Sequence, residues 1–360
     1  MNEMLAAKDS FRFAGHEISW AGFCPWTGKP CFGTGDGKLL LLGDAEEESK
    51  GVPALHIFED EAVNGVAFSD SHMAISSRSQ VRFMPSPLGS GSPLPPQLIC
   101  DQGAHGVSAL ESGGFIAPLG HDGLLLMQQN GNDPTIRVGR IPGKPINFYQ
   151  LNALEQGPSG EIFAAAARTS GLLSLTLQGE SITSWNTHRF EGIDIVSVCS
   201  LKSASWPRAV VALNRDGRLL WTVDILEDKP PQMIELDGLT GTMNSVFSAH
   251  GHVFTLTDSK LITMPHLAEK FLTGVAMNLP IDAMDLSIEA VDAFLVGDDE
   301  LFVIAGDEVF SFSVNDLVAG TSRNPGTLIA DPSQGVSFRP SILKLDWSIS
   351  EPAFGELVFA

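Results

Sequence analysis

The sequence is poor in basic residues. It holds 22 Lys and Arg against 43 Asp and Glu, which gives a formal net charge of −21 at pH 7. A field of that sign repels nucleic-acid phosphates and anionic lipid headgroups, so we expect neither nucleic acid nor a membrane surface as a direct partner. A protein or peptide partner is instead expected to present a basic or mixed surface.

Long apolar runs are also missing. No stretch reaches the roughly 18 to 20 apolar residues that a bilayer-spanning helix requires. The opening "MNEMLAAKDSFRF" has no basic start followed by an apolar run and no small-residue cleavage site. We therefore expect a cytoplasmic globular protein, and 43% hydrophobic content over 360 residues is enough for a sizeable core.

Cysteine is scarce: four residues in so long a chain do not make a disulfide framework. Cys24 and Cys31 flank the turn "PWTGKP", so on a hairpin they could face each other across two antiparallel strands. Cys100 and Cys199 stand alone, without further metal-ligand residues at useful spacing. We expect reduced cysteines that pack as small apolar residues, and no metal centre built on them.

Catalytic signatures are absent as well. The sequence has no Ser elbow, no HExxH and no Cys and His pair at useful spacing. "GTGDG" at 33–37 lacks the GxGxxG spacing and following helix of a dinucleotide cradle. We therefore expect no cofactor, and an enzyme is the less favoured interpretation.

What the sequence does contain is a repeat. A turn rich in Gly, Asp or Ser and followed by an apolar run recurs seven times, as in "GDGKLLLL" at 35–42 and "RDGRLLWTV" at 215–223. Such turns between apolar runs are a strong hairpin signal, because these residues tolerate a positive φ. Steps of 42 to 48 residues separate the turn markers, which are Gly37, Ser79, Gly123, Gly171, Gly217, Ser259 and Asp307.

Each unit supplies four short β-like runs. Two runs precede the turn, one follows it, and a fourth stands before the next unit, with segment 270–277 in that place in the sixth unit. Four strands per unit of about 40 to 45 residues are typical of a β-propeller blade. We therefore predict an all-β, seven-bladed β-propeller with four antiparallel strands per blade and little helix.

The seventh blade lacks a fourth strand after its turn. "SFRFAG" at 10–15 stands before the first unit and is the candidate for that outer strand. A ring closed in this way by an N-terminal strand would leave no exposed sheet edge at the chain ends. We therefore predict one propeller domain over residues 1–317, with 318–360 as an extension that packs on the propeller or stays partly flexible.

This pattern resembles a divergent WD-repeat type of β-propeller over residues 10–317. The resemblance lies in period and strand order, because neither the Gly-His dipeptide before the inner strand nor the Trp-Asp dipeptide at the end of the third strand recurs in the units. Trp221 in "RLLWTVD" is near the place of that tryptophan. The resemblance implies a scaffold or docking subunit that binds a protein or peptide on one face.

One polar residue per unit stands at or just before the innermost strand. In a propeller these strands line the central channel and start on the same face, so the side chains would ring one mouth. Turn-flanking Asn and Asp that merely cap strands would explain them equally simply. As partner-binding candidates we take Glu17, Asn64, His105, Asn147, Asp194, Asn244 and Asp292.

A second functional interpretation stays open. Asn, Asp and Glu oxygens suit calcium, and calcium-dependent lactonases resembling gluconolactonase carry such ligands round a propeller channel. Those enzymes have six blades, however, and their extended motifs are missing here. The sequence leaves open the partner's identity, the oligomeric state and whether the polar ring holds an ion.

Overall fold

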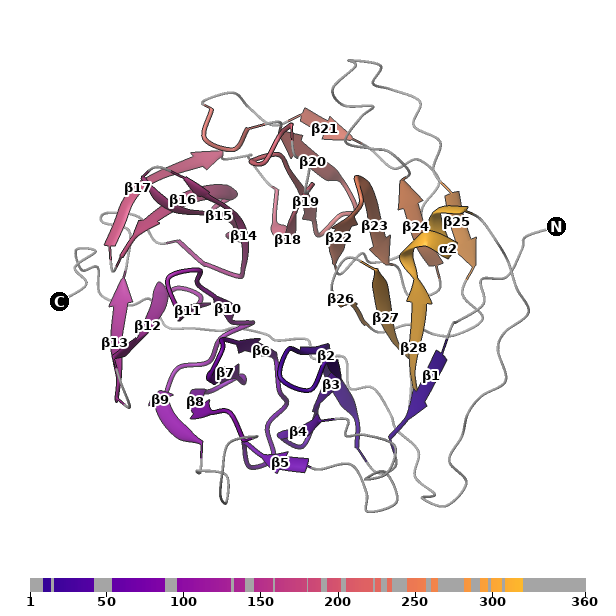
Figure 1. The fold of residues 1–360 in the computed structure, drawn as a ribbon. Coiled ribbons are helices and arrows are strands. Elements are labelled where there is room, and N and C mark those ends of the chain that lie inside the picture. The colour runs from indigo at the N-terminus through magenta and orange to yellow at the C-terminus, as the bar shows by residue number, and fades with distance from the viewer. Residues whose placement is uncertain are drawn as a thin grey trace. The chain divides into compact units, whose positions relative to one another are not determined.

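The structure is a computed structural model of the full chain (Figure 1). Among its described residues, 28 strands form seven four-stranded antiparallel sheets. The residues that the structure describes are 9–13, 16–41, 54–87, 96–130, 133–139, 146–157, 159–179, 181–188, 193–201, 205–222, 224–227, 232–234, 245–256, 260–264, 282–285, 292–296, 299–305 and 308–319.

Three of these sheets form one compact unit, called here the three-sheet unit. Sheet 1 holds β2 (Ile18–Cys24), β3 (Lys29–Thr34), β4 (Lys38–Leu41) and β5 (Ala54–His56). Sheet 2 holds β6 (Gly65–Phe68), β7 (His72–Ser76), β8 (Val81–Pro85) and β9 (Gln97–Cys100). Sheet 3 holds β10 (Ser108–Ala109), β11 (Gly114–Pro118), β12 (Leu124–Asn130) and β13 (Asp133–Gly139).

The other four sheets form a second compact unit, the four-sheet unit. Sheet 4 holds β14 (Gln150–Gly157), β15 (Gly160–Ala166), β16 (Leu172–Gln178) and β17 (Ser181–His188). Sheet 5 holds β18 (Ile195–Ser200), β19 (Val210–Asn214), β20 (Leu219–Thr222) and β21 (Gln232–Ile234). Sheet 6 holds β22 (Val246–Ala249), β23 (His252–Leu256), β24 (Lys260–Met264) and β25 (Asp282–Asp285).

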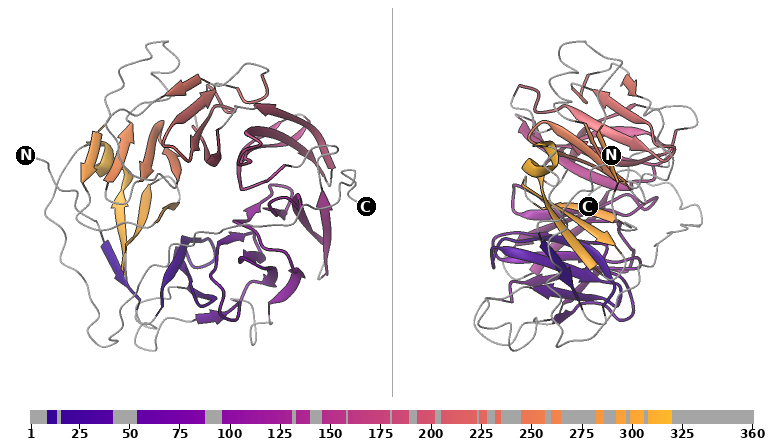
Figure 2. Two further views of the ribbon diagram at one scale, coloured as in Figure 1. Left: turned by 180° about the vertical axis from the view of Figure 1, so that it is seen from behind. Right: turned by 90° about the vertical axis from the view of Figure 1, so that its right-hand side faces the viewer.

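Sheet 7 joins the two ends of the described chain. It contains β26 (Asp292–Val296), β27 (Glu300–Ala305), β28 (Glu308–Ser313) and β1 (Asp9–Arg12), in the order β1-β28-β27-β26. The indigo strand β1 lies along the yellow-orange strand β28 in Figures 1 and 2. Of the predicted outer strand at 10–15, residues 10–12 pair with β28 as expected, whereas 14–15 lie outside the described residues.

The hairpin turns lie where the repeat predicted them. Gly37, Gly123, Gly171 and Gly217 have φ angles of +85°, +104°, +101° and +83°. A side chain with a Cβ rarely adopts such a backbone, which is why glycine recurs at these turns. The predicted markers Ser259 and Asp307 lie outside the described residues.

The second and third strands of the sheets supply much of the core. Every residue of β11, β15, β19 and β23 is buried, and these strands are nearly all apolar. Strands buried on both faces read as continuous rather than alternating apolar runs. One core cluster joins sheets 2 and 3, and within the four-sheet unit two others join sheets 4 and 5 and sheets 6 and 7.

The positions of two strands differ from the sequence prediction. The outer strand of sheet 6 is β25, "DAMD", whereas the apolar segment 270–277 expected there lies outside the described residues. In the fourth unit the first β-like run of the sequence is "INFYQL" at 146–151, but strand β14 begins only at Gln150, near the end of that run. An outer strand is selected by backbone pairing with its neighbour and needs little apolar content, so composition locates it poorly.

A short helix, α2 (Val314–Ala319), follows β28 and was not predicted. Val314 and Leu317 of this helix are buried in the same core cluster as Phe312. In the described part of the chain, no helix has the length and apolarity needed to cross a bilayer.

The four cysteines are free thiols, as expected; Cys24, Cys31 and Cys199 are buried, and Cys100 is partly exposed. Cys31 lies opposite Gly22 and Cys24 lies opposite Lys29, so the expected face-to-face placement of Cys24 and Cys31 is wrong. The two are diagonal neighbours, a spacing of about 7–8 Å between Cα atoms that does not suit a disulfide. Burial and the nearby Cys24 raise the pKa of the Cys31 thiol, so it stays protonated.

Candidate functional site

The first strand of each sheet along its repeat corresponds to the predicted innermost strand; these strands are β2, β6, β10, β14, β18, β22 and β26. Each starts at the end of its sheet where the turn between the second and third strands lies. Backbone bonds fix this arrangement in sheets of both units. Gly35 N donates to Glu17 O at 2.7 Å in sheet 1, and Arg215 N donates to Asp194 O at 2.9 Å in sheet 5. The polar positions Glu17 and Asp194 are thus held by their own sheets.

A second set of backbone bonds joins neighbouring sheets at this same end. In the three-sheet unit, Val63 N donates to Thr34 O at 3.1 Å and Ala104 N donates to Ser77 O at 3.0 Å. In the four-sheet unit, Arg168 N donates to Ile195 O at 3.1 Å. Each of these bonds connects the turn of one sheet to the segment entering the next, so it repeats with the sequence repeat.

The predicted site residues of the three-sheet unit all keep partial exposure; they are Glu17, Asn64, His105 and Asn147. Asn64 Nδ2 donates to Ala104 O at 3.2 Å, which ties sheet 2 to the segment entering sheet 3. The His105 ring packs against the Tyr149 ring with centroids 4.1 Å apart. Asn64 therefore does more than cap its own strand: its side chain bonds the neighbouring segment.

Asp194 of the four-sheet unit lies between two arginines. Its Oδ1 is 2.9 Å from Arg168 Nε, an ion pair that lacks hydrogen-bond geometry, and its Oδ2 is 3.9 Å from Arg215 Nη1. Arg168 comes from the turn of sheet 4 and has a φ of 49°. Both carboxylate oxygens of Asp194 thus face cations, and the Arg168 contact links sheet 4 to sheet 5.

Asp292 links sheets 6 and 7. Its Oδ1 accepts hydrogen bonds from Ser245 Oγ at 3.3 Å and from its neighbour Ala293 N at 2.8 Å. The residue keeps some exposure, but protein atoms surround its carboxyl group, and this burial raises the pKa of Asp292 to about 6 against the two hydrogen bonds. Asn244, the remaining predicted site residue, lies outside the described residues.

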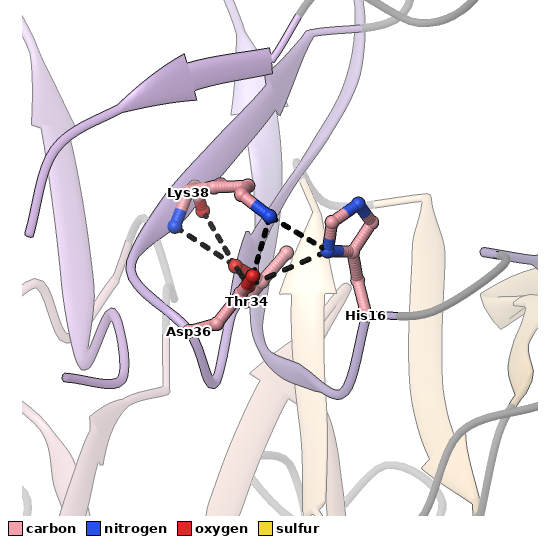
Figure 3. A network of polar contacts seen from close by, with 4 residues as sticks. All are labelled: His16, Thr34, Asp36 and Lys38. Carbon is pink, nitrogen blue, oxygen red and sulfur yellow. Dashed lines mark hydrogen bonds and ion pairs between the residues drawn. The ribbon is translucent and has the colours of Figure 1, made fainter. Parts of the chain in front are cut away.

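A polar network at the start of sheet 1 was not predicted as a site. Figure 3 shows His16, Thr34, Asp36 and Lys38 converging from the approach to β2 and from the β3–β4 turn. Asp36 accepts from Thr34 Oγ1 and from Lys38 Nζ, each at 2.5 Å, while His16 Nδ1 lies 3.4 Å from Asp36 Oδ1 and from Lys38 Nζ. Burial opposes ionisation of Asp36, but its hydrogen bonds and the charges of His16 and Lys38 lower its pKa overall.

The sequence did hold a signal for this network. Gly15 and His16 stand in Gly-His order directly before β2, so the absence of that dipeptide inferred for the units is wrong for the first one. The segment "GTGDG" at 33–37, rejected as a dinucleotide cradle, supplies Thr34 and Asp36, and Lys38 follows it directly. Its polar side chains bond one another and fix the turn.

A comparable contact lies just before β6, the innermost strand of sheet 2. Glu61 accepts hydrogen bonds from Ser77 Oγ at 2.6 Å and from Ser79 Oγ at 2.5 Å, both in the turn of sheet 2. Burial raises the pKa of Glu61, yet these bonds outweigh it and the net shift is downward. An acidic residue therefore stays ionised beside the predicted position Asn64.

Among the described residues, no group of three or more His, Cys, Asp and Glu side chains is arranged to hold a metal ion. The described polar groups at this end of the sheets form ion pairs and hydrogen bonds with one another and with the backbone.

No protein family profile and no curated protein sequence matches this chain. Solved structures do resemble it. The Cps50 (Swd1) β-propeller domain of Myceliophteria thermophila has a TM-score of 0.62 at 14% identity, covering 85% of this chain and 99% of that domain. Virginiamycin B lyase of Staphylococcus aureus has a TM-score of 0.64 at 8% identity, covering 85% and 98% of the two chains.

The inactive variant of that lyase with quinupristin gives a TM-score of 0.63 at 8% identity, with the same coverage of both chains. At such low identity, the likenesses concern the fold alone, because one fold hosts unrelated functions. The chain has an all-β fold similar to β-propeller domains.

Proposed function

We propose that residues 1–317 form one closed, seven-bladed, WD-repeat-like propeller that serves as a non-enzymatic protein-interaction module in the cytoplasm. Seven four-stranded sheets and the completion of sheet 7 by β1 support the closed ring. The likeness to propeller domains supports the blade-like role of each sheet. Residues 318–360 are then an extension of this domain.

The observation that carries the binding proposal is how the polar positions are held. Six of them are described, all are partly exposed, and Asn64, Asp194 and Asp292 are fixed by side-chain contacts to a neighbouring sheet. Side chains that are both accessible and rigid lose little entropy when a partner binds. In the closed ring, the six would share one face with Asn244.

The partner's chemistry follows from charge. With a net charge of −21, the chain attracts cationic surfaces and repels acidic ones over a Debye length of about 8 Å at physiological salt. Glu17 and Glu61 add acidic groups at the innermost-strand ends of sheets 1 and 2. We therefore propose a protein or peptide with a basic or mixed surface as the partner.

The calcium-dependent hydrolase is the weaker interpretation for a physical reason. Asp194 turns both carboxylate oxygens toward arginines, which compete with any cation for the same atoms. Asp292 Oδ1 already accepts two hydrogen bonds, from Ser245 Oγ and from Ala293 N, so this oxygen is occupied and not free to coordinate a cation. Calcium sites rely on ionised carboxylates and carbonyls that are free to coordinate.

Association kinetics test the docking face once a pull-down from the native source has identified a partner. Glu17→Gln, before the innermost strand of sheet 1, should slow association severalfold, because charges at a docking face act on encounter rates. Glu111→Gln is the matched control: Glu111 is exposed and follows the innermost strand of sheet 3 at its far end. Equal effects of the two variants, or binding that responds only to Asp346 and Trp347, would contradict the proposed face.

Metal analysis and thermal melts with and without calcium test the alternative. The interaction module should show no stoichiometric ion and no calcium-dependent shift. A bound ion with a large shift in melting temperature would overturn the proposal in favour of the hydrolase, because a ligand of the folded state stabilises it by mass action.

A further inference from the structure

Strand β13 is a long edge strand with two exposed apolar side chains. It has seven residues and is the terminal strand of sheet 3; β17 in the same position of sheet 4 has eight, whereas β5, β9 and β21 have three or four. Ile136 and Val138 of β13 are 41% and 39% exposed. A long edge strand with exposed apolar side chains offers backbone N–H and C=O groups together with a hydrophobic face, so another strand can pair with it.

Ile136 and Val138 extend the apolar face that sheet 3 contributes to the core. Ile136 lies opposite Met127 and Val138 opposite Leu125 in the pairing of β12 with β13, so all four side chains share one face of sheet 3. Met127 and Leu125 are fully buried in the cluster that joins sheets 2 and 3. The apolar face thus runs from the core to the edge of the sheet, where the described part of the chain leaves it uncovered.

The sequence contains a segment whose apolar pattern matches this edge. Residues 343–349, "LKLDWSI", lie outside the described residues and alternate strictly between apolar and polar. Leu343, Leu345, Trp347 and Ile349 occupy one face of such a strand, and Lys344, Asp346 and Ser348 the other. The segment has seven residues, as β13 has, so the two can pair along this edge except at Pro134, which has no backbone N–H to donate.

The connection is long enough for this pairing. The described chain ends at Ala319, which leaves 320–342 as a link to the segment. A link of that length can span roughly 70–80 Å when extended, which exceeds the dimensions of a domain of this size. Residues 343–349 can therefore reach β13 of the same chain. The effective concentration of this tethered segment is higher than that of the same segment on a second molecule.

We propose that residues 343–349 add to the edge of β13 as a fifth strand of sheet 3, with their apolar face beside Ile136 and Val138. Main-chain hydrogen bonds would satisfy the edge, and alternate side chains would set the register, as in other strand additions. This inference concerns the chain's own extension and is independent of the docking face proposed above.

Hydrogen exchange of the full chain tests the pairing. We expect the amides of β13 to exchange about tenfold faster in Leu345→Asp than in the native chain, because the variant puts a charge on the apolar face of the segment. Ser348→Asp adds the same charge on the opposite face and should leave β13 protected. Exchange in β17, an eight-residue outer strand of sheet 4, should be the same in all three proteins.

A second test places the substitution in β13 and measures its effect on the segment, as the rate of trypsin cleavage after Lys344. Ile136→Asp should speed that cleavage about tenfold, since a segment released from the sheet is open to protease. Thr183→Asp, at an exposed position of β17, is the control and should not change it. Both substituted residues are on outer strands, and far-UV circular dichroism confirms that each variant folds.

Two results would overturn the proposal. In the first, Leu345→Asp leaves hydrogen exchange of β13 unchanged and Ile136→Asp leaves the rate of cleavage after Lys344 unchanged. The other is protection of β13 that grows with protein concentration, which would identify a second copy of the chain as the occupant of the edge.

Discussion

Ser10 of β1 lies directly opposite Phe310 of β28, although the two residues come from opposite ends of the described chain. The pairing extends over four positions, from Asp9 with Ser311 to Arg12 with Glu308. Sheet 7 is therefore complete only when both ends of the domain are present. A long-range pairing of this kind couples the stability of the last sheet to the first residues of the chain.

Deleting residues 1–15 should lower the melting temperature by about 5 °C or more, because sheet 7 loses its outer strand and the pairing partner of β28. A chain that begins at Asp9 keeps all of β1 and serves as the control. Thermal unfolding followed by circular dichroism compares the two. A 1–15 deletion that melts within a degree or two of the full chain would show that β1 contributes nothing to the domain.

Gly103→Ala should destabilise the protein by about 2–3 kcal/mol, because a Cβ at this position would overlap the backbone carbonyl of Arg78. Gly106 is three residues away and has open space where a Cβ would be, so Gly106→Ala should change stability by less than about 0.5 kcal/mol. Urea unfolding measures both. Equal stability of the two variants would mean that the segment between sheets 2 and 3 is packed differently.

Asn64→Ala should cost about 1 kcal/mol, since it removes the bond from Nδ2 to Ala104 O and leaves that carbonyl short of a partner. Glu111→Ala, at an exposed turn position, is the control and should be close to neutral. The free energies come from the same urea titrations. If the two variants have the same stability, the Asn64 side chain is not a link between sheets.

Asp292→Asn should stabilise the protein at pH 8 and have little effect near pH 4. The pKa of Asp292 is raised to about 6 in the folded state, above its ordinary value of 3.8. The folded protein therefore carries the cost of a buried charge above pH 6, and this cost is relieved as the pH falls from 6 towards 4. A shift of about two units corresponds to a gain of about 1–3 kcal/mol in the variant at pH 8.

Urea unfolding of both proteins across pH 4 to 8 checks this sign. Titration of the other carboxylates is common to both proteins, so the difference between them isolates Asp292. A difference that is the same at pH 4 and pH 8 would show that the Asp292 carboxyl does not titrate in this range.

The sequence by itself determined the repeat and the turns. Gly37, Gly123, Gly171 and Gly217 were expected at hairpin turns, and all four have positive φ there. Turn chemistry is local, since a residue without a Cβ is needed wherever the backbone enters that region. The buried strands, such as β15 with "GEIFAAA", could also be predicted from the sequence, because continuous apolar runs indicate strands that are covered on both faces.

Only the tertiary structure decided the outer strands and the partners of the polar positions. Composition favoured segment 270–277 over β25, and it gave no hint that Asp194 faces Arg168 or that Asn64 bonds Ala104. The two polar contacts join residues 26 and 40 positions apart, and their formation depends on the placement of neighbouring sheets rather than on local propensity. An outer strand or a cross-sheet ion pair is chosen by what lies beside it, and a sequence pattern does not record that neighbour.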